Sequence, residues 1–105
     1  MSFVELAAGV KVDDDALRAL CDRHGIRQLA LYGSALRDAL HADSDIDLLV
    51  DFRPDRLPGL LGIAAIELEL GELLGREVDL RTRSDLSRYF RDEVVRTARV
   101  LHEAA

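Results

Sequence analysis

Two aspartates near the middle of the sequence have the residue type and spacing to hold a metal ion. Asp45 and Asp47 are two residues apart at the start of an apolar stretch. On a β-strand their carboxylates would project from the same face, roughly 7 Å apart at the backbone. Carboxylates this close repel each other, and a divalent cation removes that cost. Mg²⁺ suits such a pair because it combines one or two protein carboxylates with water and phosphate oxygens.

A third acid, Asp79, alternates with Val78 and Leu80 in a later apolar stretch. If its strand is a neighbour of the first one, three carboxylates converge on one face of the sheet. Three carboxylates can hold two metal ions, and the two-metal arrangement suits in-line displacement at phosphorus. Asp45, Asp47 and Asp79 are therefore the candidate metal ligands.

A Gly-Ser pair lies upstream of these acids, between a predicted strand and a predicted short helix. Gly33 would let the backbone approach a phosphate closely. Amides at the helix start, together with the Ser34 hydroxyl, favour an anion, and Arg37 could reach the same phosphates. Alone, each pattern is more typical of an ordinary turn or a solvated strand end. Their combination predicts a site for a metal–nucleotide complex.

The elements that must position these residues follow from the apolar periodicity. It predicts helices over residues 13–24, 34–40 and 59–74, strands over 26–32, 46–52 and 76–81, and a last helix from Ser84 or Asp85 to the C-terminus. This order fits an α/β (α+β) domain spanning residues 1–105, with a small three-stranded mixed sheet and helices on one face. We expect Ile46, Leu48, Val50 and Phe52 under the helices and the carboxylates on the open face. Tyr89 and Phe90 are expected to pack in the core, and the alternative is an exposed pair that would suggest an interface.

Composition narrows the function classes. The chain of 105 residues is 49% hydrophobic and 32% charged, which is typical of one globular domain. Its net charge of −6 argues against nucleic acid as the main partner, because no basic surplus exists to neutralise phosphates. The single cysteine, Cys21, excludes an internal disulfide and a Cys-rich zinc site. No signal peptide or membrane span is apparent, so we expect a cytoplasmic protein.

The stretch GSALRDALHADSDIDLLV resembles the signature of the minimal nucleotidyltransferases of the DNA polymerase β-like superfamily, which is Gly-Ser, ten residues, then Asp-x-Asp. The resemblance runs from about residue 17 to residue 100. The family's third carboxylate lies in a Val-Asp-Leu strand, which matches Asp79. Asp38 stands where the family usually has glycine, and His41-Ala42 stands where an Arg-Pro-like pair is frequent. Further positions match the family pattern: Arg37, Asp43 and Ser44.

The resemblance implies a polymerase β-like fold and Mg²⁺-dependent nucleotidyl transfer, with ATP as the expected donor of AMP. Asp45, Asp47 and Asp79 would be the catalytic residues and would hold two Mg²⁺ ions. Asp79 would complete the metal site or help to deprotonate the acceptor hydroxyl. The implied nucleotide-binding residues are Gly33, Ser34, Arg37 and Ser44.

Family members of this length are often antitoxins encoded beside a HEPN-domain toxin, a helical RNase, and some transfer AMP to a tyrosine of that toxin. The resemblance therefore implies a HEPN toxin as partner, and the acidic charge is compatible with a basic protein. A homo-oligomer is compatible with the sequence as well. The alternative function is a non-catalytic antitoxin of the same fold that neutralises its partner by contact. A small-molecule acceptor and an RNA acceptor are disfavoured by the short chain and by the acidic charge.

Overall fold

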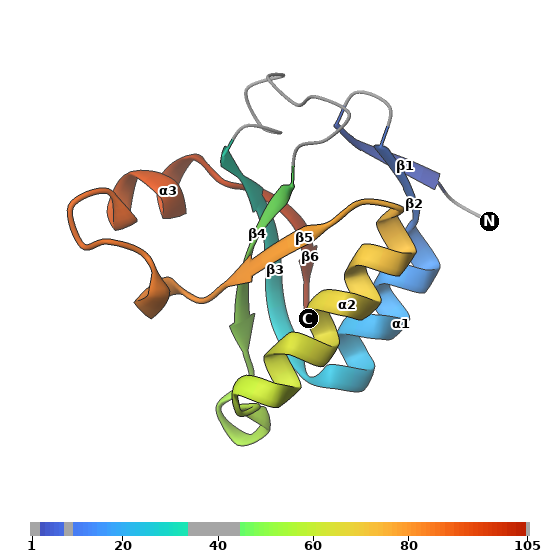
Figure 1. Cartoon of the computed structure of the whole chain (residues 1–105), viewed down its shortest axis with the longest axis horizontal. Helices are drawn as coiled ribbons and strands as arrows, with labels where there is room; N and C mark the ends of the chain where they lie inside the picture. Colours follow the sequence, from blue (N-terminus) through green and yellow to red (C-terminus); the bar gives the residue numbers. More distant parts are fainter. Residues whose placement is uncertain (1–2, 8–9, 34–44, 105) are drawn as a thin grey trace.

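The computed structural model of the chain describes residues 3–7, 10–33 and 45–104. A four-stranded sheet of order β5-β4-β3-β6 carries α1 and α2 on one face, and a two-stranded hairpin, β1-β2, lies beside α1 (Figure 1). No described helix has the length and apolar character needed to cross a membrane. The elements are β1 (Phe3–Ala7), β2 (Val10–Asp13), α1 (Asp14–His24), β3 (Ile26–Tyr32), β4 (Ile46–Phe52), η2 (Pro54–Arg56), α2 (Leu60–Leu74), β5 (Val78–Arg81), η3 (Arg83–Asp85), α3 (Arg91–Thr97) and β6 (Arg99–Glu103).

The two long helices begin and end where their caps predict. The Asp13 carboxylate accepts a hydrogen bond from the Asp15 amide at 3.0 Å and caps α1. Gly25 ends α1 and Gly75 ends α2, with φ of 69° and 70°. These left-handed conformations close a helix with little strain only at glycine. The predicted helices over 13–24 and 59–74 are therefore confirmed to within one residue.

Side-chain alternation along β4 gives the strand a buried face and a face that is more exposed to solvent. Ile46, Leu48 and Val50 are at most 2% exposed and pack in the core with α1 and α2. Cys21 is fully buried in the same core, and burial raises the pKa of its thiol to about 12, so it is packed as a small hydrophobe. Strands β3 and β4 have the predicted bounds, and β5 begins at Val78, two residues later than predicted.

The predicted C-terminal helix is wrong. In its place the chain forms η3, the short helix α3 and the strand β6, which pairs antiparallel with β3. Strand β4 occupies only one edge of β3, and β6 supplies partners for the other edge, where buried backbone groups need hydrogen bonds. The sheet therefore has four strands rather than three. Tyr89 and Phe90, predicted in the core, are 86% and 49% exposed.

The N-terminal hairpin was not predicted from the sequence. β1 and β2 pair antiparallel, and β2 carries Val10 and Val12 into the core, where they are 2% and 1% exposed. The predicted helix over 34–40, and with it Ser34, Arg37 and Ser44, lies outside the described residues.

Candidate active site

Three polar side chains form a row across the face of the sheet that points away from the core. Asp47 on β4 is the cross-strand partner of Asp79 on the parallel strand β5 and of Tyr32 on the antiparallel strand β3. Neighbouring strands are roughly 5 Å apart, so cross-strand partners on one face interact directly. The structure thus brings together Asp47 and Asp79 from two separate stretches of the sequence, as predicted.

The surroundings of this row disfavour the ionised forms of its own side chains. Burial raises the pKa of the Asp47 carboxyl, the negative charges of Asp79 and Asp45 add to the rise, and Arg81 opposes it. Burial and the charge of Asp47 also raise the pKa of the Tyr32 hydroxyl to about 12. Each ionised carboxylate therefore disfavours the next, which is the condition that a bound cation relieves.

Arg81 supplies a positive charge at one end of the row. Its Nε donates a hydrogen bond to Oδ2 of Asp79 at 3.1 Å, and both residues are on the same face of β5 because they are two positions apart. This contact holds the pKa of the Arg81 guanidinium above its usual range.

Gly33 directly follows β3 and packs against the carboxylate of Asp47. Its φ of 79° lies in the left-handed region, and a Cβ added there would overlap Oδ2 of Asp47. Two independent constraints therefore require glycine at this position, the backbone conformation and the close approach of the carboxylate. The sequence indicated a glycine for phosphate contact, whereas the structure shows that Asp47 itself already needs the space.

Asp45 is not a member of the cross-strand row, but it lies close enough to add to the rise in the pKa of Asp47. It is exposed, directly precedes β4, and lines an open hollow of about 700 Å³ between α2 and β5, together with Asp79, Glu67, Glu72 and Arg76. Within the described ranges, no group of three or more His, Cys, Asp or Glu side chains is arranged to hold a metal ion. The structure therefore unites Asp47 with Asp79 and leaves Asp45 beside them.

Two residues of this region were not singled out from the sequence. Tyr32 could have been found, because strand alternation places it on the same face as Gln28 and it directly precedes Gly33. Glu67 could not have been found, because its role depends on tertiary packing. Its Oε2 accepts a hydrogen bond from the Leu80 amide at 2.8 Å and so fixes the outer edge of β5 to α2.

The chain is similar in sequence to known proteins. The nucleotidyltransferase domain family matches residues 14–101. A curated relative, the protein adenylyltransferase MntA of Thermococcus cleftensis, is 41% identical over 69 residues, which cover 66% of this chain and 68% of that protein.

Solved structures share the fold. One, described as a minimal nucleotidyltransferase, has a TM-score of 0.67 and 39% identity, covering 81% of this chain and 85% of its own. Another is a tri-AMPylated HEPN toxin of Shewanella oneidensis in complex with an MNT antitoxin, with a TM-score of 0.61 and 18% identity, covering 87% of this chain and 70% of that one. At 18% identity, this second likeness shows the fold alone.

Proposed function

Since the chain belongs to the nucleotidyltransferase domain family, we propose that it transfers AMP from ATP onto a hydroxyl group of a HEPN toxin and thereby acts as its antitoxin. The observation that carries the proposal is the pairing of Asp47 with Asp79 on the open face, with Gly33 packed against Asp47. The adenylyltransferase activity named for the 41% identical relative supports it. The AMPylated HEPN toxin in the structural neighbour gives the partner class.

The donor set fits Mg²⁺. Asp47 and Asp79 offer the one or two carboxylates that this ion takes from proteins. Burial and the nearby charge of Asp79 raise the pKa of Asp47, and a bound cation would offset both effects. Bound by these residues and Asp45, two Mg²⁺ ions would neutralise the triphosphate and stabilise the charge that develops during transfer. Gly33, Ser34, Arg37 and Ser44 would contact the nucleotide.

The transfer itself exchanges one phosphorus–oxygen bond for another. The acceptor hydroxyl oxygen attacks the α-phosphorus of ATP, the bond from that phosphorus to the bridging oxygen breaks, and pyrophosphate leaves. Asp79 accepts the hydroxyl proton as general base. Arg81, which donates to Oδ2 of Asp79, positions that carboxylate.

A labelling experiment tests the function. The protein is incubated with Mg²⁺, ATP labelled at the α-phosphate, and the protein encoded by the neighbouring gene, which is the expected HEPN protein. Label should appear on the HEPN protein, and Asp47→Asn should abolish it. Asp51→Asn is the matched control because Asp51 shares the strand and face of Asp47 but pairs with Arg27, so label should persist.

The same assay distinguishes the enzymatic function from the alternative, a non-catalytic antitoxin. Absence of label with wild-type protein, together with full neutralisation of the HEPN protein by both wild type and Asp47→Asn, would overturn the enzymatic proposal. That result would establish the non-catalytic antitoxin that acts by contact.

A further inference from the structure

The segment between β5 and β6 differs in charge from the rest of the chain. Residues 81–99, here called the arm, run from the last residue of β5 to the first residue of β6. The arm contains six arginines, of which Arg81 and Arg99 belong to the two strands, and three acidic residues, so its formal charge is +3 in a chain of −6. The arm leaves the sheet after β5, projects outward through η3 and α3, and returns as β6 (Figure 1). Leu86, which is 5% exposed, anchors it, and Nη2 of Arg91 donates to the Leu86 carbonyl at 2.9 Å.

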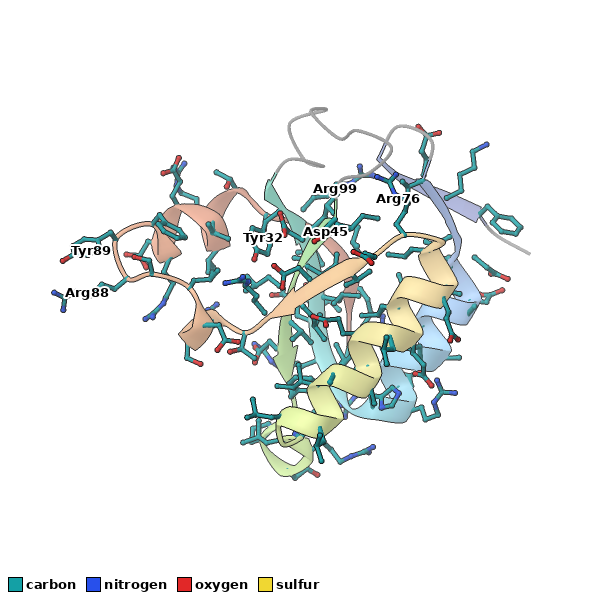
Figure 2. All side chains as sticks on the ribbon, viewed as in Figure 1. Tyr32, Asp45, Arg76, Arg88, Tyr89 and Arg99 are labelled. Carbon is teal, nitrogen blue, oxygen red and sulfur yellow. The ribbon has the colours of Figure 1, made fainter. Side chains whose placement is uncertain are left out.

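Two aromatic side chains are exposed in the turn before α3. Tyr89 is 86% exposed and Phe90 is 49% exposed, and the Arg88 guanidinium lies 5.3 Å from the centroid of the Tyr89 ring. Arg88 and Tyr89 lie at the outermost end of the arm, far from the sheet (Figure 2). Tyrosine and arginine are enriched among the residues that dominate binding energy in protein interfaces. This turn therefore has the composition of a contact surface.

A small basic hollow lies on the same arm. Arg83, Arg91, Val95 and Arg96, with Asp92, line a space of about 200 Å³. Within the described part of the chain, Arg83 and Arg96 form no ion pair, and the buried Nε of Arg91 has no hydrogen-bond partner. Guanidinium groups grouped in this way can donate several charge-assisted hydrogen bonds to one carboxylate.

We propose that the arm is the surface that holds the partner protein: the arginine hollow takes an aspartate or glutamate from an acidic patch of the partner, and Tyr89 and Phe90 pack on apolar surface beside it. The partner is the acceptor protein of the proposed function, on which this inference rests. The overall charge of the chain is compatible with a basic partner, but the local charge of the arm favours an acidic patch.

A protein fits the arm better than a nucleic acid does. The hollow is the size of one side chain, and Asp85, Asp92 and Glu93 are interspersed among the arginines, where they would repel a continuous phosphate backbone. The arm also begins at Arg81, which contacts Asp79. Docking on the arm would therefore place the acceptor protein near the carboxylate row.

Binding of the neighbouring-gene HEPN protein, measured by calorimetry without nucleotide, tests the surface. The double variant Arg83→Glu/Arg96→Glu should raise Kd about 100-fold, and Tyr89→Ala about 10-fold. Arg18→Glu/Arg53→Glu is the matched charge control because these arginines line a different hollow, formed by α1 and β6. Leu61→Ala, at a side chain 88% exposed on α2, is the matched apolar control. Both controls should keep the wild-type Kd.

Transfer kinetics separate this inference from the proposed function. Arm variants should raise KM for the HEPN protein and leave kcat unchanged, whereas Asp47→Asn should remove transfer and leave Kd unchanged. If the arm variants lose binding and the wild-type protein shows no transfer, the enzymatic function is overturned and the arm is supported as the binding surface. If the arm variants keep the wild-type Kd, the proposal that the arm binds the partner is overturned, whatever the transfer assay shows.

Two further measurements complete the test. Thermal unfolding checks that each variant is folded. If Arg83→Glu/Arg96→Glu is unfolded, the neutral variant Arg83→Gln/Arg96→Gln is used in its place and should weaken binding about 10-fold. A labelled RNA hairpin is titrated in parallel. Tight RNA binding that the reversal abolishes, with binding of the HEPN protein unchanged, would overturn the proposal in favour of a nucleic-acid surface.

Discussion

Asp47 combines a proposed functional role with a cost in stability. Its pKa is raised in the folded protein by burial and by Asp79, so the folded state holds the proton more tightly than the unfolded chain does. The unfolded carboxyl loses its proton near its usual pKa of 3.8, and stability therefore falls as pH rises from that value through the raised pKa.

Asp47→Asn should accordingly raise the melting temperature at pH 7 in metal-free buffer by a few degrees, because it removes the unfavourable charge. The gain should vanish near pH 3, where the carboxyl is protonated in both states. Thermal unfolding across this pH range checks both points. A variant less stable than wild type at pH 7 would contradict the assignment, and Asp51→Asn, whose carboxylate pairs with Arg27, should show no gain.

Gly33 should tolerate no side chain. Gly33→Ala meets both a left-handed backbone and the carboxylate of Asp47, so we expect a loss of more than about 1 kcal/mol in unfolding free energy, together with loss of nucleotide transfer. Gly75→Ala is the matched control, since Gly75 has a similar φ of 70° but no heavy atom within 4 Å of an added Cβ. Urea denaturation should show the smaller loss for Gly75→Ala, and equal losses would mean that Asp47 does not set the requirement.

At the scale of elements, β5 is an edge strand whose exposed backbone needs a partner. Glu67 on α2 provides one by accepting the Leu80 amide hydrogen. Glu67→Ala should cost about 1 kcal/mol and speed hydrogen exchange at the Leu80 amide. Glu72→Ala, five residues later on α2, is the control and should leave that amide protected. Unchanged exchange in Glu67→Ala would show that the contact does not hold the strand.

Sequence periodicity predicted those elements whose patterns and caps are local. The alternation of Ile46 to Phe52 defined β4, and Gly25 and Gly75 marked the helix ends. The open-face prediction placed Asp47 and Asp79 on the same side of the sheet. The register that makes them cross-strand partners was not predicted, because it depends on how β4 and β5 pair.

The C-terminal third could not be predicted in this way. Leu86, Val94 and Leu101 have spacings compatible with one helix, and neither glycine nor proline interrupts residues 85–103. What makes residues 99–103 a strand is the free edge of β3, which lies more than 60 residues away in the sequence. Side-chain pattern alone carries no information about that edge.

For the molecule as a whole, nucleotide binding should appear as added stability. Under the proposed function, ATP with Mg²⁺ should bind the folded state alone, so at a hundred times its Kd it should add about 2.7 kcal/mol to the unfolding free energy. Differential scanning fluorimetry should show a rise in melting temperature that needs both components. ATP alone or Mg²⁺ alone should raise the melting temperature little. In Asp47→Asn, most of the rise caused by ATP with Mg²⁺ should be lost. A full rise in the variant would remove Asp47 from the metal–nucleotide site.

The pairing of β6 with β3 joins residues that lie far apart in the sequence, and we expect it to form late in folding. Gln28 pairs with Glu103, 75 residues later, while β3 and β4 are joined by a much shorter connection. Contacts between distant residues form slowly because long loops must close first. Because β6 comes last in the chain, α1, β3 and β4 leave the ribosome well before it during synthesis. One edge of β3 then stays unpaired until residues 99–103 follow. The sheet reaches its final form in a late step, and the arm, which ends in β6, is fixed in place in that same step.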